Sequence, residues 1–514
     1  MRLIFFLLCA ATLLTARERA SELPEELLYK RLDPLSIREQ LSFYHLYPSS
    51  PFGQKALAQA WELLQKGPGD KVELSLPPFD LQPILSLITR NSFDPIEKLS
   101  EEQLQLVESC GEHLAHRKLL GSRIWTKETL DSLPLQEIDI GRGLLINQFT
   151  NAEDAKEKIR QYEALLDLMA LQILARLPKE PTPLQKISAI NSFIFHEMNF
   201  RFPPHSLYAK QIDLFTFLSS VLDRRQGVCL GVSILYLSLA QRLDLSLEII
   251  TPPGHIFLRY KDDKRIVNIE TTARGVDLPS STYLGVNTRK LPVRTLREVL
   301  GMVFFNHASL AWETQDYRLA ATLYEKARLY MEDDPQLRML HGFSCLFAGN
   351  KKEGKELLEK GIPFLFDESV SKETLPEDYL KGDVNLKGIK TIFLPVDNKR
   401  ESILAKQKKL KKVLQKCPRF REGWYHLAVT YLQLGRESEA FDVLKKHDAL
   451  DQSNPTVAYY LSVLSLHRLD YNEAWHYLKQ AENLTAARHH APKALRHLKQ
   501  ELKRLSPPDA SLSL

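Results

Sequence analysis

The chain has 514 residues, of which 44% are hydrophobic and 26% are charged. These values are typical of folded globular protein, and the length suffices for about three domains. With 69 basic and 64 acidic residues the net charge is only +5, which gives no support for a nucleic-acid-binding protein. The clearest basic run, residues 405–416, fits the solvent-facing side of a helix better than a phosphate-binding patch.

Residues 1–20 have the layout of a secretory signal peptide. Arg2 precedes an apolar stretch from Leu3 to Leu14, and small residues and then charges follow. This stretch is too short to span a bilayer as a helix; the alternative is a buried first helix. We therefore expect export to the periplasm or the cell exterior if the signal is cleaved, a cytoplasmic protein if it is not, and no stable membrane span in the mature chain.

The five cysteines are too few and too scattered for a disulfide framework. Cys9 would be removed with the signal, and Cys110, Cys229, Cys345 and Cys417 do not have metal-ligand spacing. We therefore expect no metal and no other cofactor. A thiol retained in an exported protein is a candidate reactive group.

Residues 21–135 are predicted to form a helical N-terminal domain. Proline-containing turns separate its helices, and Ser100 followed by Gln103 has the pattern of a capping box. No motif in this domain indicates a chemical role.

Residues 136–300 combine two kinds of pattern. Helical patterns at 154–177 and 183–198 precede two runs rich in β-branched and aromatic residues, at 247–260 and 265–272, which a charged turn separates. The predicted fold class is α+β, with helices and a small antiparallel sheet forming a core between a helical N-terminal region and a C-terminal α-solenoid.

From residue 301 to 505 the sequence repeats with a period of 34 residues. Similar residues begin at Ala320 and Gly354, and again at Ala440 and Ala474. This period, with small residues where paired helices cross closely, is typical of tetratricopeptide-like repeats. The aligned residues are Ala320, Tyr324 and Ala327; Gly354, Leu358 and Gly361; Ala440, Leu444 and His447; and Ala474, Leu478 and Ala481, with Trp424, Leu427, Ala428 and Tyr431 at first-helix positions.

Two irregularities accompany the repeats. The segment at about 362–400 interrupts the array and is predicted to be either an insertion on one face of the solenoid or a disordered loop. Pro335 and Pro455 are interpreted as residues that follow helices, a few positions past the usual place.

Cys229 lies just before an apolar run that begins at Ser233 and has helical spacing. Gly227 allows the chain to turn tightly before it. The thiol is therefore predicted at the first turn of a buried helix, where unpaired amides and the helix dipole favour a thiolate and stabilise an oxyanion. The alternative is that Cys229 is only a small buried residue.

His255 and Glu270 complete a candidate Cys–His–acid set. A thiol attacks as the thiolate, an imidazole takes its proton, and a third group orients the imidazole. A hairpin turn near residues 261–264 would bring His255 and Glu270 close to opposite positions. Asn268 competes for the third role, and strand alternation, which puts it on the same face as Glu270, cannot separate the two. A structural histidine and a solvent-facing glutamate are the alternatives.

These sequence blocks resemble the core of the transglutaminase-like superfamily, specifically its bacterial SirB1-type branch, which often carries tetratricopeptide repeats. The resemblance covers about residues 140–300. It implies a papain-like core that performs acyl transfer with Cys229 as nucleophile, His255 as base and Glu270 as the orienting acid. The family usually has aspartate in the third position, so Glu270 departs from its pattern. The matching residues are Arg225, Gly227 and Cys229; Pro253, Gly254, His255 and Arg259; and Glu270 and Thr271.

The first hypothesis is therefore a thiol-dependent acyl-transfer protein, either a protease or amidase or a cross-linking transglutaminase, whose repeats dock a protein or peptide. Gly227, Gly254, Arg259 and Asn268 are its candidate supporting residues. The alternative is a non-catalytic adaptor with a degenerate transglutaminase-like domain, since some members of the branch lack the cysteine. The sequence leaves the substrate, the acyl acceptor and the oligomeric state open.

Overall fold

The structure is a computed structural model that describes residues 24–65, 82–89, 96–150, 152–204, 212–397 and 399–506. The signal expected at residues 1–20 lies outside this part of the chain. Among the described residues, no helix has both the length and the apolar character needed to cross a membrane.

The chain divides into two compact units. The first comprises the chain up to Arg201 together with 218–225 and 235–246, and the second comprises 202–217, 226–234 and the chain from Leu247 onward. The domain boundaries expected from the sequence remain predictions.

The first unit is helical in the part that the structure describes. Its longest helix, α9 (Ala155–Ala175), is largely buried and packs against α4, α6 and α8. The capping box predicted at Ser100 and Gln103 is present at the start of α6. The other elements are α2 (Glu25–Tyr29), α3 (Ile37–Leu46), α4 (Pro51–Leu64), α5 (Gln82–Thr89), α6 (Glu101–Cys110), η1 (Ala115–Lys118), η2 (Leu120–Arg123), α7 (Lys127–Ser132), η3 (Leu135–Glu137), α8 (Ile140–Phe149), α10 (Pro183–Asn191), the π-helical turn η4 (Ser192–Glu197), α12 (Leu218–Arg224) and the second half of α13 (Cys229–Arg242).

Asp167 forms the centre of a buried ion cluster in this first unit. Its carboxylate accepts hydrogen bonds from Nε of Arg242 at 2.7 Å and from Nη2 of Arg117 at 2.5 Å. The side chains of Asp167 and Arg242 are fully buried. Because a buried charge needs a partner, this cluster explains how the polar end of α13 is accommodated among apolar helices.

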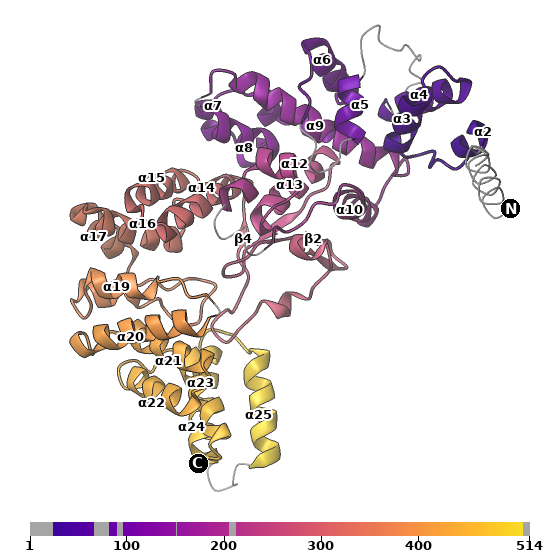
Figure 1. Cartoon of the computed structure of the whole chain (residues 1–514). Coiled ribbons are helices and arrows are strands. Elements are labelled where there is room, and N and C mark those ends of the chain that lie inside the picture. The colour runs from indigo at the N-terminus through magenta and orange to yellow at the C-terminus, as the bar shows by residue number, and fades with distance from the viewer. Residues whose placement is uncertain are drawn as a thin grey trace, which may run out of the picture. The chain divides into compact units, whose positions relative to one another are not determined.

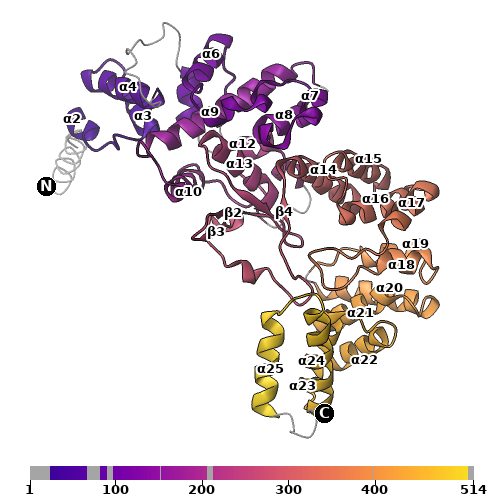
Figure 2. The same cartoon turned by 180° about the vertical axis from the view of Figure 1, so that it is seen from behind.

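The second unit contains a four-stranded antiparallel sheet with the order β3-β2-β1-β4 (Figure 2). The predicted hairpin is present, with Lys261 opposite Ile266. Asp262 shapes its turn by accepting hydrogen bonds from the amides of Lys264 and Arg265, both at 2.8 Å. The strands and short turns are β1 (Glu248–Ile250), β2 (Phe257–Lys261), β3 (Ile266–Ile269), β4 (Val293–Arg294), η5 (Ile212–Phe215), η6 (Thr271–Ala273) and η7 (Ser280–Thr282).

Helix pairs follow the sheet in the second unit (Figure 1). Helices α15 and α17 begin at Tyr317 and Lys351, and α22 and α24 begin at Glu437 and Tyr471, so the predicted 34-residue period is present. The helices are α14 (Leu296–Glu313), α15 (Tyr317–Arg328), α16 (Pro335–Ala348), α17 (Lys351–Gly361), α18 (Leu375–Leu380), α19 (Leu386–Ile392), α20 (Arg400–Lys416), α21 (Arg421–Gln433), α22 (Glu437–Asp448), α23 (Pro455–His467), α24 (Tyr471–Ala486) and α25 (Lys493–Leu505).

The small residues of the repeats lie where helices meet. Ala320, Ala440 and Ala474 are completely buried. A Cβ atom added to Gly354 would lie 2.6 Å from Cγ of Leu346 and 2.7 Å from the carbonyl oxygen of Gly342, so a larger residue cannot enter without separating α16 from α17. The residues on which the repeat prediction depended are therefore packing residues.

The structure refines two expectations about the repeats. Pro335 and Pro455 come after α15 and α22, as expected, and each also occupies the first position of the next helix, α16 and α23, where a missing N–H costs no helical hydrogen bond. The segment 362–400 is not irregular throughout, because it contains the short helices α18 and α19. Asn385 caps α19 by accepting a hydrogen bond from the amide of Gly388.

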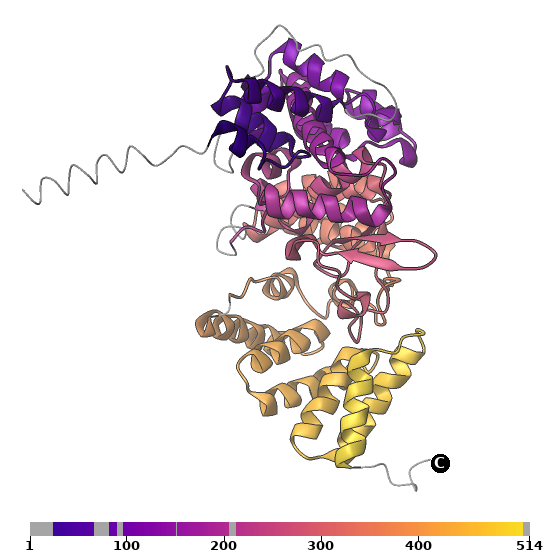
Figure 3. The ribbon, with the colours of Figure 1, turned by 90° about the vertical axis from the view of Figure 1, so that its right-hand side faces the viewer.

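Helix α25 lies alongside α23 and α24 (Figures 2 and 3). Its residues Leu495, Leu498 and Leu502 are buried against a cluster that includes Ala474 and Leu478. Helix α25 therefore covers an apolar face of the α23–α24 pair.

Candidate active site

Cys229 is the first residue of α13. The helical hydrogen bonds of α13 begin with the amide of Val232, which donates to the carbonyl of Val228 at 3.0 Å. The amides of residues 229–231 therefore have no acceptor within the helix. The cysteine is free and partly exposed. Its thiol therefore stands beside backbone donors and at the positive end of the helix dipole, as the sequence predicted.

A tight turn positions His255. Its amide donates to the carbonyl of Pro252 at 3.1 Å, and Gly254 has φ of +72°, which together with Pro253 matches a type II turn. The turn ends just before β2, so the imidazole of His255 is held beyond the N-terminal end of this inner strand. Its side chain is 25% exposed, which leaves it accessible from solvent.

The imidazole of His255 has polar partners on two sides. Its Nε2 atom lies 2.7 Å from Oε2 of Glu270, and the Cys229 thiol is its other hydrogen-bond partner. Burial lowers the pKa of His255, but the hydrogen bonds to Cys229 and Glu270 and the charge of Glu270 outweigh burial and raise the pKa to about 9. The ring of His255 is therefore protonated at neutral pH.

Glu270 is a fully engaged carboxylate that is only 3% exposed. Oε1 accepts from the amide of Thr272 at 3.1 Å and from its hydroxyl at 2.6 Å, and Oε2 accepts from His255 and from the phenol of Tyr283. Burial raises the pKa of Glu270, but the bonds from His255, Thr272 and Tyr283 lower it to about 2. Glu270 is thus ionised at every pH at which the protein would work.

Tyr283 is a site residue that the sequence reading missed. Its hydroxyl donates to Glu270, and its ring stacks on His255 at a centroid separation of 5.8 Å and on Phe257 at 4.6 Å. It follows the short turn η7, far from any strand pattern, so no periodicity points to it. Only the folding of the loop after β3 back over the sheet brings it to the imidazole.

Asn268 and Glu270 have different roles, which the strand pattern could not separate. The Asn268 amide accepts from Nε of Arg259 at 3.0 Å and donates to the carbonyl of Leu278 and the hydroxyl of Ser280. Arg259 also donates to Ser280 at 3.0 Å. Asn268 and Arg259, two of the candidate supporting residues, therefore hold the loop that carries Tyr283. The partner of His255 is Glu270 and not Asn268.

Gly227 lies so close to Val232 in the first turn of α13 that a side chain would not fit there. A Cβ atom there would lie 2.8 Å from Cγ2 and 2.9 Å from the amide nitrogen of Val232, so only glycine lets the chain turn this closely into α13. Behind this turn, the hydroxyl of Ser233 on α13 lies 3.1 Å from that of Thr271, the residue after Glu270. The helix that carries the thiol is therefore linked directly to the segment that carries the acid.

The Cys229 thiol and His255 line a cleft of about 990 Å³ in the second unit. Thr251, which follows β1, and Ile256, which precedes β2, form part of one wall. The other wall comes from the repeat region: Met302, Phe305, Asn306 and Ser309 of α14, Met331, Asp334 and Gln336 around the start of α16, and Phe366, Glu368 and Ser369 of the interrupting segment. A molecule that reaches the thiol would therefore contact repeat residues.

Arg294 joins the two walls. It donates to the hydroxyl of Thr251 at 3.0 Å and to Glu298 at 2.9 Å, and it forms an ion pair with Asp334 at 2.9 Å. Its side chain is mostly buried, so these contacts are poorly screened. The start of the repeat array is thus fixed to the loop that leads to His255.

Residues 160–300 match the model of a family described as the transglutaminase-like superfamily. This range includes Cys229, His255 and Glu270. The chain contains a transglutaminase-like domain. Among curated proteins, none matches the chain.

Solved structures of repeat proteins also match, at low similarity. They include MamA (MSR-1), with 20% identity and a TM-score of 0.18 over 36% of this chain and 95% of that one. TTC0263, a thermophilic TPR protein of Thermus thermophilus, has 20% identity and a TM-score of 0.20 over 40% and 97%. YrrB, a TPR protein with an unusual peptide-binding site, has 15% identity and a TM-score of 0.21 over 39% and 92%. These scores are too low to carry an argument, so the repeat architecture rests on the helix pairs of this chain.

Proposed function

We propose that this protein is a thiol-dependent acyl-transfer enzyme in which Cys229, His255 and Glu270 form the catalytic triad. The observation that carries the proposal is the 2.7 Å contact between Nε2 of His255 and Oε2 of Glu270. The other partner of the same imidazole is the thiol of Cys229, which lies at the N-terminus of α13. Glu270 holds the imidazole in one orientation, which leaves Nδ1 for the thiol.

The reaction follows from this arrangement. The Cys229 thiolate attacks the carbonyl carbon of an amide, and the oxyanion is held by amides of the first turn of α13. The C–N bond then breaks, His255 gives its proton to the leaving amine, and a thioester remains on the sulfur. Water or a second amine attacks the thioester, gives a proton to His255 and restores the thiolate. Water makes the protein an amidase or protease, and an amine makes it a cross-linking enzyme.

The repeats are proposed to help bind the acyl donor, which we take to be a protein or peptide. Support comes from the cleft, because residues of α14 and of the segment after α17 form one of its walls beside the thiol. The partly exposed Cys229 thiol and the paired His255 imidazole line the same cleft, which favours catalysis over an inactive adaptor. Export, expected from residues 1–20, remains part of the proposal.

A direct test uses peptide p-nitroanilides as acyl donors and a fluorescent primary amine as a competing acceptor. The full chain should release p-nitroaniline and form a transient adduct on Cys229 that intact-mass spectrometry detects. Replacement C229A should abolish both, and H255A should slow release by about 10²-fold or more. Amine incorporation would identify the protein as a transferase. If no donor acylates Cys229 and C229A behaves like the unmodified chain, the proposed reaction is wrong.

A further inference from the structure

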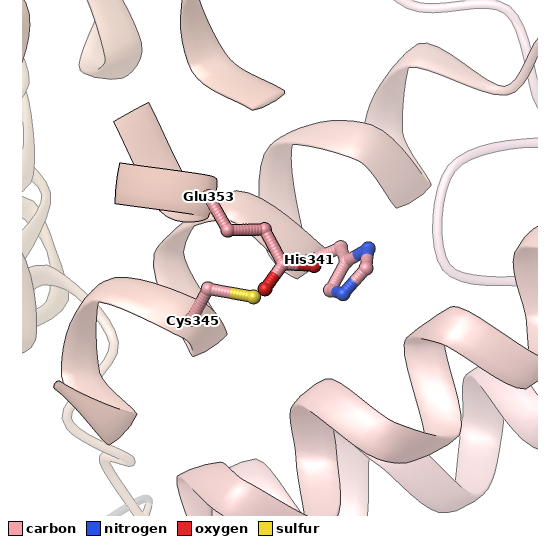
Figure 4. Close-up of side chains that lie close together, drawn as sticks. All are labelled: His341, Cys345 and Glu353. Carbon is pink, nitrogen blue, oxygen red and sulfur yellow. The ribbon is translucent and has the colours of Figure 1, made fainter. Parts of the chain in front are cut away.

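A second cluster of ligand-type side chains lies on the helix pair α16 and α17. His341 and Cys345 are four residues apart on α16 and therefore share one face, and Glu353 lies in the first turn of α17. A ring nitrogen of His341, the sulfur of Cys345 and a carboxylate oxygen of Glu353 all lie within 4.8 Å of one another. Figure 4 shows the Glu353 carboxylate between the thiol and the imidazole.

The His341 imidazole is buried without full satisfaction of its polar atoms. His341 is 2% exposed and Cys345 is 3% exposed. Among the described residues, Nδ1 of His341 has no hydrogen-bond partner, and the carboxylate of Glu325, 3.7 Å from it, is too distant to accept one. A buried polar atom of this kind requires an explanation, and a cation on the other ring nitrogen supplies one, because it would fix Nδ1–H as a donor that faces Glu325.

The ligand set and its dimensions suit a zinc-type cation. Imidazole nitrogen, thiolate sulfur and carboxylate oxygen are its usual ligands, and three of them leave one position of a tetrahedron for water or a fourth side chain. Metal–ligand bonds of about 2.0–2.3 Å place tetrahedral ligand atoms about 3.5 Å apart. Only a modest contraction of the cluster is needed, and the exposed Glu353 side chain has the freedom to supply it.

Neighbouring residues give the ligands the support that metal sites require. The side-chain amide of Asn350, the residue before α17, donates to Glu353. Glu325 is held by Arg328 through two hydrogen bonds of 2.9 and 2.6 Å and faces His341. With one ring nitrogen on a cation, the other could donate to Glu325, in the carboxylate–histidine–metal arrangement found in zinc proteins.

We propose that His341, Cys345 and Glu353 bind one divalent cation of the zinc type. The cation replaces the proton of the Cys345 thiol, which otherwise donates to Glu353. His341 and Cys345 lie on α16 and Glu353 lies on α17. The ion therefore crosslinks these two helices near the start of the repeat array. The site is separate from the acyl-transfer triad and does not depend on the proposed function.

The test uses the full chain carrying C229S, because Cys229, His255 and Glu270 form another Cys–His–acid set that could bind metal. Protein stripped with a chelator is titrated with Zn²⁺ against a chromophoric chelator and with Co²⁺ in the ultraviolet, where a cobalt–thiolate bond gives a charge-transfer band. We expect one equivalent of either ion and a thiolate band. Added C345S should remove the band, and H341Q and E353Q should each weaken binding more than about tenfold.

Control variants separate ligand loss from misfolding. C417S removes a different free thiol on the array and should keep both the band and the affinity. E353Q changes an exposed side chain, so circular dichroism should show unchanged helix content while Zn²⁺ no longer raises its Tm. The proposal fails if the chain takes up no stoichiometric ion, or if C345S and E353Q bind Zn²⁺ as tightly as their parent.

Discussion

Nε2 of His255 lies 2.7 Å from Oε2 of Glu270, although the two residues are outside the paired strands. The β2–β3 ladder pairs Leu258 with Ile269, so His255 lies beyond one end of it and Glu270 directly follows β3. Side chains from both segments therefore meet at the rim of the sheet. The glutamate reaches the imidazole because its side chain is long enough to cross this distance.

The reactivity of Cys229 is the first testable consequence. At neutral pH, iodoacetamide should alkylate Cys229 at least about tenfold faster than Cys110 or Cys345, because a protonated His255 stabilises the thiolate. Burial raises the pKa of Cys110 to about 11, and burial together with the charges of Glu353 and Glu325 raises that of Cys345 to about 12. Peptide mass spectrometry after timed quenching gives the three rates.

His255 provides the control for this experiment. H255A should slow alkylation of Cys229 to a rate typical of an ordinary thiol and leave the rates of Cys110 and Cys345 unchanged. Equal rates at all three cysteines in the unmodified chain, or an unaltered Cys229 rate in H255A, would contradict the triad.

The pH dependence of His255 is the second prediction. Its pKa of about 9 means that the imidazolium, which protonates the leaving amine, is lost as the pH rises through 9, so acyl transfer should decline there. E270Q keeps a hydrogen-bond acceptor but removes the negative charge, and it should lower the pKa of His255 by roughly one unit. An NMR titration of the imidazole protons measures this shift without a substrate. A pKa that does not move in E270Q would show that Glu270 does not act on the ring.

The free energy of unfolding should depend on pH through the same two groups, His255 and Glu270. Because the pKa of His255 is raised above its ordinary value of 6.5, its contribution is fully present below pH 6.5 and is lost as the pH rises through about 9. Glu270, with its pKa lowered from 4.5 to about 2, contributes above pH 4.5 and loses that contribution as the pH falls towards 2. Urea unfolding of the chain and of H255Q across these ranges should therefore differ most between about pH 4.5 and 6.5 and converge above pH 9.

Tyr283 is predicted to be a positioning residue. Y283F keeps the ring that stacks on His255 and removes only the hydrogen bond to Glu270, so it should reduce the free energy of unfolding by about 1 kcal/mol and slow acyl transfer by roughly tenfold or less. Y283A also removes the stacked ring and should cost more in both measurements. If Y283F changes stability but not the rate or the pH profile, Tyr283 only supports the fold.

The glycines Gly227 and Gly285 offer a matched pair for stability. G227A would place a Cβ atom 2.8 Å from the Val232 side chain, and it should destabilise the protein by about 1–3 kcal/mol. G285A places its Cβ no closer than 4.0 Å to another residue, at Thr288, and should be nearly neutral. Chemical denaturation compares them, and a neutral G227A would show that the turn before Cys229 can relax.

The repeats and the position of the thiol could be predicted from the sequence because both depend on local spacing. Small residues every 34 positions are enough to specify helix pairs, and Ala320, Ala440 and Ala474 are fully buried as that pattern requires. In the same way, a glycine turn followed by an apolar helical run places Cys229 at the start of α13. The sequence placed Pro335 after one helix but did not identify it as the first residue of the next, because both positions suit a proline.

The partners of His255 were decided by the tertiary structure. Strand alternation left Asn268 and Glu270 equivalent, and only the loop folding back after β3 gave Asn268 to Arg259 and Ser280 and brought Tyr283 to Glu270. The wall of the cleft formed by α14 and by Phe366 and Glu368 also has no local signal. Periodicity reports which residues share a face of one element, whereas these contacts join elements far apart in the chain, and their geometry exists only once the second unit has folded.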